Sequence, residues 1–218
     1  MDVFNATVKF FQEGGVFMYP IMLVFALGAA IAIERYMYLS LAKRTNRSTW
    51  DKLTPLVKAN NFDQAMALAS RSRAEVGKIL SYGLSRLKMS KNRNDIEIAM
   101  EEGLMEVIPR LEKRTHYLAT FANIATLLGL LGTIIGLIQA FTAVANANPA
   151  DKADLLSASI SVAMNTTAFG LMAAIPLLLM YAVLQTKTTE LVDSMEMATV
   201  KFLNTMTESK QVSTGAAG

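Results

Sequence analysis

Two long stretches of this sequence, residues 118–145 and 155–184, contain no Asp, Glu, Lys, Arg or His. A third apolar stretch, residues 18–41, carries only Glu34 and Arg35 near its end. As helices these stretches would be roughly 36 to 45 Å long at about 1.5 Å per residue, enough to cross a hydrocarbon layer of about 30 Å. A soluble protein of 218 residues cannot bury three such helices on all sides. The sequence therefore predicts an all-α integral membrane protein with three transmembrane helices.

The composition excludes several classes of function. Charged residues make up only 18% of the chain, against about a quarter in soluble domains, and the net charge of +3 is too small to indicate nucleic-acid binding. The absence of cysteine excludes disulfides and Cys-zinc sites, and the single histidine, His116, makes a histidine metal cluster implausible. There is no paired carboxylate in a span, no Ser-His-Asp arrangement and no phosphate-binding glycine loop. We therefore predict neither an enzyme nor a cofactor site.

The basic residues predict the orientation of the spans. Residues 42–115 carry 15 of the 21 Lys and Arg, whereas the segment before the first span carries only Lys9 and the connection at 146–154 only Lys152. Loops rich in Lys and Arg stay on the cytoplasmic side of a membrane. The N-terminus and the short connection are therefore expected outside, and the C-terminus inside. Asp2 lies where a signal peptide would have basic residues, so cleavage of the first apolar stretch is not expected.

The resulting organisation has seven segments. It consists of a periplasmic interfacial helix (1–16), transmembrane helix 1 (17–41), a cytoplasmic helical domain (42–115), transmembrane helix 2 (116–145), a periplasmic loop (146–154), transmembrane helix 3 (155–185), and a cytoplasmic helix with a disordered tail (186–218, the tail from 213).

Apolar residues at helical spacing predict the buried faces of the cytoplasmic helices. Pro109 is expected to interrupt one of these helices, and residues 50–70 to form one or two shorter ones. The predicted faces are Val76, Ile79, Leu80, Gly83, Leu84 and Leu87; Ile96, Met100, Leu104, Val107 and Leu111; and Leu191, Met195, Ala198, Phe202 and Met206.

Uncharged polar residues within the spans are the strongest functional signal. Polar groups at membrane depth are expected to face a partner helix or a water-filled path, and the alternative is that they join helices. Small residues accompany them and predict close packing of spans two and three. The polar residues are Asn123, Thr126, Thr133 and Gln139 in span two and Asn165, Thr166 and Thr167 in span three; the small ones are Gly129, Gly132, Gly136, Gly170 and Ala174.

Neither span two nor span three offers a carboxylate to carry a proton. Glu34, at the end of span one beside Arg35, is interpreted as half of an interfacial ion pair with that arginine. If the chain conducts protons, it is expected to borrow a carboxylate from another chain.

Several motifs resemble the MotA/TolQ/ExbB proton-channel family, on its three-span ExbB/TolQ branch. They are LLGLLGTIIGLIQAF at 127–141 and NTTAFGL at 165–171 followed by AAIP at 173–176, with GG at 14–15, MYP at 18–20 and IER at 33–35. The resemblance covers nearly the whole chain. The order and spacing of the motifs in spans two and three make it specific.

The resemblance implies a homopentamer whose pore holds a dimer of a single-span ExbD/TolR-like partner with one membrane aspartate per chain. Thr133 and Thr167 match the family's pore threonines, and Pro176 matches a bend in span three. Polarity alone adds Asn165 and Thr166 to the predicted pore lining. The sequence departs from many relatives at Val162, where they carry a glutamate, and at 125–126, where Ala-Thr stands for their Ala-Pro.

The predicted function is therefore a proton-channel subunit of a motor complex in the bacterial inner membrane, which converts proton motive force into mechanical work on the cell envelope, with a TonB-like envelope-spanning protein as a further partner. Two alternatives stay open. One is a membrane scaffold without ion conduction. The other is a sodium-driven version of the same motor, because hydroxyl and amide oxygens can ligate a hard cation.

Overall fold

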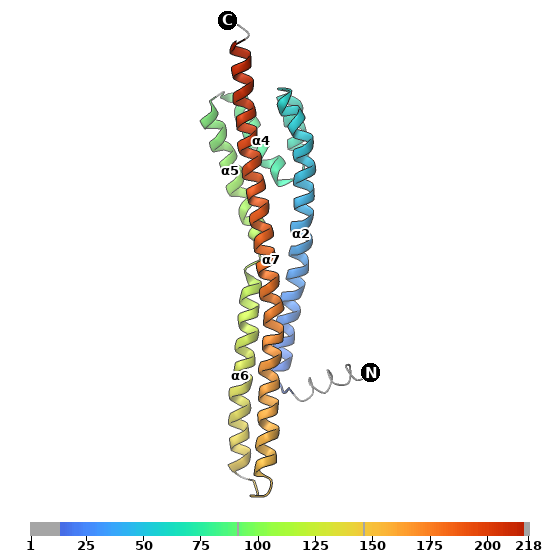
Figure 1. Cartoon of the computed structure of the whole chain (residues 1–218), viewed down its shortest axis with the longest axis vertical. Coiled ribbons are helices and arrows are strands. Elements are labelled where there is room, and N and C mark those ends of the chain that lie inside the picture. Colours follow the sequence, from blue (N-terminus) through green and yellow to red (C-terminus); the bar gives the residue numbers. More distant parts are fainter. Residues whose placement is uncertain (1–13, 91, 146, 216–218) are drawn as a thin grey trace, which may run out of the picture. The chain divides into compact units, whose positions relative to one another are not determined.

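The computed structural model describes residues 14–90, 92–145 and 147–215, and within these ranges the chain forms six α-helices (Figure 1). Three helical stretches are long and apolar enough to cross a membrane. The all-α membrane fold with three spans is thereby confirmed. Of the predicted interfacial helix at 1–16, residues 1–13 lie outside the described residues. The helices are α2 (Met18–Lys58), α3 (Phe62–Arg71), α4 (Glu75–Met89), α5 (Arg93–Glu112), α6 (Tyr117–Ala145) and α7 (Lys152–Gly215).

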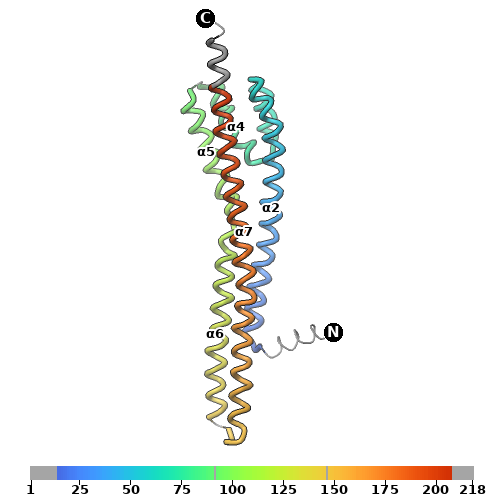
Figure 2. The backbone as a smooth tube through the Cα atoms, in the orientation of Figure 1, coloured from blue at the N-terminus to red at the C-terminus, as the bar shows by residue number. Residues whose placement is uncertain are grey.

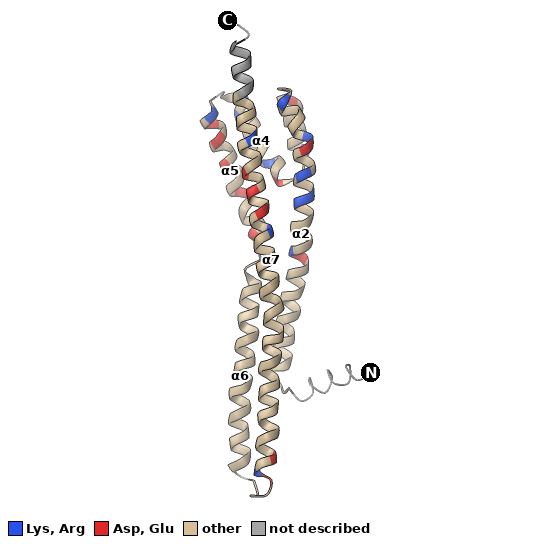
Figure 3. Cartoon of the chain, viewed as in Figure 1, with Lys and Arg blue, Asp and Glu red and all other residues tan. Residues whose placement is uncertain are grey.

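The chain divides into two compact units. We call Met1–Arg35 with Arg114–Val183 the apolar unit, and Tyr36–Lys113 with Leu184–Gly218 the charged unit. Figure 3 shows the difference between them: the described parts of α6, and of α7 up to its middle, are almost free of charge, whereas α4, α5 and the later parts of α2 and α7 carry many acids and bases.

In the apolar unit, α6 lies against the first half of α7, and a short connection after Ala145 joins the two helices (Figure 2). The 29 residues of α6 contain no charged side chain, so the helix can satisfy its backbone groups internally and offer lipid an apolar surface. The first part of α2 completes the unit and contacts α7, where Gly28 faces Leu177.

The helix α2 is longer than expected. Residues 50–58 do not start a separate short helix but continue α2 as far as Lys58. Pro55 lies within its last turn. The chain then reverses through Asn60, whose φ of 56° is the left-handed conformation that Asn tolerates.

Two other helices pass through positions at which an end was expected. Pro109 lies inside α5, which ends three residues later at Glu112, so the helix is not interrupted at the proline. The helix α7 includes Pro176 and reaches Gly215, beyond the predicted start of the tail at 213. The sequence up to 212 contains good helix formers and no further proline, which is consistent with this extension.

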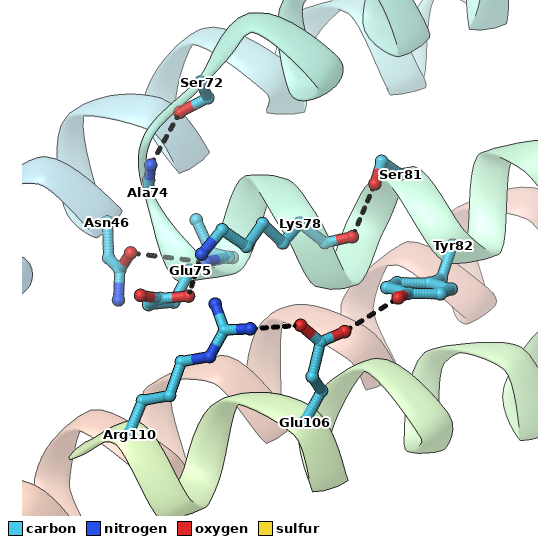
Figure 4. A network of polar contacts seen from close by, with 10 residues as sticks. Asn46, Ser72, Ala74, Glu75, Lys78, Ser81, Tyr82, Glu106 and Arg110 are labelled. Atoms are coloured by element: carbon cyan, nitrogen blue, oxygen red, sulfur yellow. Dashed lines mark hydrogen bonds and ion pairs between the residues drawn. The ribbon is translucent and has the colours of Figure 1, made fainter. Parts of the chain in front are cut away.

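The core of the charged unit lies where the apolar periodicity places it. The predicted faces of α4, α5 and α7 are buried, except that Leu87 and Met206 are half-buried. The helices α4 and α5 approach closely at Gly103, where an added Cβ would lie 3.2 Å from Ile79 Cα. Polar contacts reinforce this pairing on the surface, because Glu106 accepts hydrogen bonds from Tyr82 of α4 (2.7 Å) and Arg110 (2.5 Å), as Figure 4 shows.

The N-terminus of α4 is capped by a residue from another helix. Its own N-cap residue, Ala74, has no side-chain oxygen to accept from the free N–H groups of the first turn. Asn46 of α2 takes this role: its Oδ1 accepts from Val76 N at 3.3 Å, and the residue is 5% exposed (Figure 4). The contact ties the beginning of α4 to α2.

We predict that Asn46→Ala lowers the free energy of unfolding by about 1 kcal/mol, the usual effect of removing an N-cap. Thermal unfolding of the purified protein in detergent, followed by circular dichroism, measures this effect. Asn94→Ala is the matched control, because it removes an exposed amide of the same unit that caps nothing. Equal stability of the two variants would contradict the capping role.

Candidate functional site

The helices α6 and α7 touch through backbone rather than side chains at one level of the apolar unit. A Cβ added to Gly170 would lie 2.7 Å from Ala125 O and 3.0 Å from Gly129 Cα. One added to Gly129 would lie 3.2 Å from Thr167 Cα. Any side chain at either glycine would therefore force the helices apart. Gly136, two turns along from Gly129, lies close to a side chain, with 2.8 Å between an added Cβ and Ala163 Cβ.

Because the backbones are so close, two threonines from different helices share one carbonyl. Thr133 Oγ1 lies 3.2 Å and Thr167 Oγ1 2.9 Å from Gly129 O, and both can donate to it. The two hydroxyls also hydrogen-bond to each other. Thr133 Oγ1 lies within 3.5 Å of Ala163 O as well. The structure thus brings together the two threonines that the sequence singles out, and both are half-buried.

Both members of this threonine pair can donate and accept hydrogen bonds without carrying charge. Each hydroxyl has one hydrogen to donate and two lone pairs that accept. While one hydrogen is directed at Gly129 O and the other at the neighbouring hydroxyl, free lone pairs can accept from water or from a protonated carboxyl group. Rotation about χ1 lets a hydroxyl donate to a carboxylate instead. The pair itself has no group that titrates near neutral pH, and the described residues contain no cluster of three or more potential His, Cys, Asp or Glu metal ligands.

Thr166 points to a different neighbour from Thr167. It is 2% exposed, and its Oγ1 donates to Gly14 O (2.6 Å) or Val162 O (3.0 Å). Its methyl group occupies the space beside Gly132, where an added Cβ would lie 2.4 Å away. This geometry joins helices within one chain, which is the alternative that the sequence left open for the polar residues.

Asn165 is half-buried and forms no hydrogen bond with any residue that the structure describes. Three polar residues of α6, Asn123, Thr126 and Gln139, are exposed on the surface of the single chain. Of these, Thr126 satisfies its hydroxyl by donating to Ala122 O at 3.1 Å. Exposed amides in an apolar helix are expensive against lipid, so this surface is suited to contact with another chain or with water.

Glu34, predicted to form an interfacial ion pair with Arg35, has a partner from another segment. Glu34 pairs with Arg114, at 3.5 Å, and both side chains are half exposed. Consecutive residues on a helix point about 100° apart and do not face each other, so a partner from another segment is favoured. Arg114 reaches this position from the turn between α5 and α6, where its φ is 66°. Arg35 is 3% exposed.

Sequence reasoning missed one contact of the apolar unit. Gly28 of α2 packs against the side chain of Leu177, with 2.7 Å between an added Cβ and Leu177 Cδ2. The Gly-Ala-Ala run at 28–30 was the available signal, since small residues mark close helix contacts in membranes. Leu177 follows Pro176, which is exposed and lies inside α7.

We predict that Gly170→Ala lowers the free energy of unfolding by about 1–3 kcal/mol, because its Cβ would meet backbone atoms that cannot move separately from their helix. Gly28→Ala is the control, since its Cβ would meet only the flexible end of Leu177 and should have a smaller effect. Thermal unfolding in detergent compares the two. An effect of Gly28→Ala as large as that of Gly170→Ala would contradict the backbone-contact argument.

Comparisons with known proteins agree with this architecture. Residues 71–197 match the MotA/TolQ/ExbB proton channel family. The chain is 30% identical over 207 residues to a putative biopolymer transport protein ExbB homolog of Methanothermobacter thermautotrophicus, covering 90% of this chain and 69% of the relative. It is 29% identical over 161 residues to the Tol-Pal system protein TolQ of Haemophilus influenzae, covering 70% of each. With the biopolymer transport protein ExbB of Salmonella typhimurium the identity is 30% over 142 residues, which is 58% of this chain and 55% of the relative.

These matches confirm the resemblance seen in the sequence. Two of these relatives are named as biopolymer transport proteins, and the family consists of channel subunits rather than enzymes. This chain is an integral membrane protein with three spans, and it belongs to the MotA/TolQ/ExbB proton channel family.

Proposed function

We propose that the chain is the channel subunit of a motor that converts proton motive force into mechanical work on the cell envelope. The observation that carries this proposal is the threonine pair, Thr133 with Thr167, on one carbonyl between two helices that contain no charged side chain at that level. Protons pass beside this pair. The driving force is about 2.3 kcal/mol per charge per 100 mV of membrane potential.

The missing titratable group is supplied by a second protein. A proton needs a carboxylate or an unbroken chain of water to cross a low-dielectric layer, and the threonine pair can only accept or donate hydrogen bonds. We propose an ExbD/TolR-like partner with a single span and one membrane aspartate per chain. Its carboxyl group, neutral while it moves past lipid-like surroundings, exchanges its proton where Thr133 and Thr167 can hydrogen-bond to it.

The exposed polar residues of α6 support an assembly rather than a single chain. Asn123 and Gln139 lie on the surface of the apolar unit, where a lone copy would place them against lipid. We propose a homopentamer around a partner dimer, with a TonB-like protein carrying the work outward. The complex lies in the bacterial inner membrane with the N-terminus periplasmic and the C-terminus cytoplasmic, since most Lys and Arg lie between residues 42 and 115.

The proposed function predicts an effect of substitutions in the threonine pair. Thr133→Val and Thr167→Val are each expected to abolish proton flux, because valine keeps the volume of threonine and removes the hydroxyl. Proton uptake into vesicles that contain the complex, with an imposed membrane potential, measures the flux. Thr133→Ser and Thr167→Ser are the matched controls and should retain it, since serine keeps the oxygen.

These variants also distinguish the alternatives. Normal proton flux in both valine variants would contradict the assignment of Thr133 and Thr167 to the proton path. A chain that assembles with its partner but never conducts would favour the scaffold. Activity that follows external sodium at fixed pH would favour a sodium-driven motor, in which the threonine hydroxyls and the Gly129 and Ala163 carbonyls offer oxygen ligands.

The proposed function also predicts the subunit composition of the complex. Co-expression of the chain with a single-span protein that carries a membrane aspartate should give a complex of five copies and two partners by native mass spectrometry. The 23.8 kDa mass of this chain makes copy number easy to read. An assembly that forms without any such partner would leave the pore without a titratable group and would contradict the channel proposal.

A further inference from the structure

A groove runs between α2 and α7 in the charged unit. It contains two adjoining cavities of about 460 and 370 Å³, which share Trp50 and Lys201. Its floor is apolar and includes Val57, Val76 and Phe202. Cavities of this size are large enough to receive side chains of another molecule.

The groove carries unpaired positive charge. At one end Lys43 is neutralised by Glu190 at 2.6 Å, and this lysine holds the pKa of the Glu190 carboxyl below its ordinary value. Farther along, Arg47, Lys58 and Lys201 form no ion pair with any described residue. The larger cavity also contains an acid, Asp193, that is unpaired among the described residues.

The groove also contains a buried donor. Asn46 is 5% exposed and lines the larger cavity, and its Nδ2 has no acceptor among the described residues. An occupant of the groove therefore meets three cations beside apolar lining residues. This combination is suited to an acidic occupant with an apolar stripe.

The same chain carries such a surface on α5. Ile98 and Met105 are 46% and 73% exposed, although both are large apolar side chains. Glu101 and Glu102, between them, are exposed and have no ion pair with a described residue. At about 100° per residue, these four residues share one face of the helix, opposite the buried stripe that packs on α4.

The two surfaces lie at the same level of the charged unit. Arg93, the first residue of α5, donates to Asn204 (3.1 Å) and Thr207 (3.3 Å) of α7. The helix α5 then runs opposite in direction to α7 (Figure 1). The exposed face of α5 begins roughly 8 Å from Arg93 at about 1.5 Å per residue, level with the α7 side of the groove.

We propose that the groove of one copy receives the exposed face of α5, residues 98–105, from a second copy. The inference rests on the proposed function, since a shared membrane holds all copies at one depth and so keeps the two surfaces level. Arg47 and Lys201 then pair with Glu101 and Glu102, while Ile98 and Met105 cover Trp50 and the apolar floor. Because the two surfaces differ, the contact is head-to-tail, and repeating it around the membrane normal closes a ring.

Cross-linking tests the contact. Because the chain contains no cysteine of its own, only the introduced cysteines can react. Full-length chain carrying Arg47→Cys and Glu102→Cys together, in membranes, is treated with a short bismaleimide. We expect a ladder of chain multiples on a denaturing gel. The control pair, Lys52→Cys with Glu102→Cys, should give none, because Lys52 lines a separate cavity on the α3 side of α2.

Charge reversal gives an independent measurement. Glu101→Lys with Glu102→Lys should lower the association constant of the copies roughly tenfold, because like charges then meet across the contact. Adding Arg47→Glu and Lys201→Glu to the same chain should restore it. Circular dichroism of each variant reports whether it has folded.

The outcomes separate this inference from the proposed function. Native mass spectrometry of the unmodified chain first shows whether copies assemble. If they assemble, but the Arg47–Glu102 pair gives no ladder or the Lys52 pair gives an equal one, the contact is overturned while the channel proposal stands. Adducts to a different protein in place of the ladder would also overturn it, as would an association constant unchanged by charge reversal. A chain that stays monomeric overturns both proposals.

Discussion

The close approach of α6 to α7 is the constraint on which the apolar unit depends. At Gly129 and Gly170 the two backbones meet with no room for a side chain. Only at this separation can Thr133 and Thr167, on different helices, reach the same carbonyl oxygen. In a hydrocarbon environment with little hydrophobic drive between helices, contacts of small residues and hydrogen bonds of this kind hold spans together. The packing contact and the candidate site are therefore one structure.

The neighbouring threonines Thr166 and Thr167 of α7 contact different parts of the apolar unit because of helix geometry. Successive side chains on a helix diverge by about 100°, so Thr166 points to Gly14 and Gly132 while Thr167 points to α6. The first is buried and links the start of the apolar unit to α7. The second is half-buried and, in the proposed channel, remains within reach of water or a partner's carboxyl group.

The charged unit follows a different rule, because its helices carry many acids and bases and bury only one face. Its apolar stripes pack α4 on α5, and the remaining acids and bases are distributed unevenly, with acids on α5 and unpaired cations along the groove of α2 and α7. Such an imbalance is not required for the fold of one copy. In the proposed assembly it directs neighbouring copies to a single head-to-tail arrangement, while the uncharged spans leave the ion pathway to the threonines and the partner.

Periodicity and length in the sequence determined the three spans and the buried faces of α4, α5 and α7, because burial against lipid or a core leaves a residue-by-residue pattern. The family motif singled out Thr133 and Thr167, but their contact with each other was decided by the tertiary structure, since residues 34 apart carry no local sign of contact. The partner of Glu34, the remote cap of α4 by Asn46 and the packing of Gly28 on Leu177 were decided by tertiary structure alone. Each joins segments distant in sequence, and a hydrogen bond or ion pair of that kind depends on where folding places the two atoms.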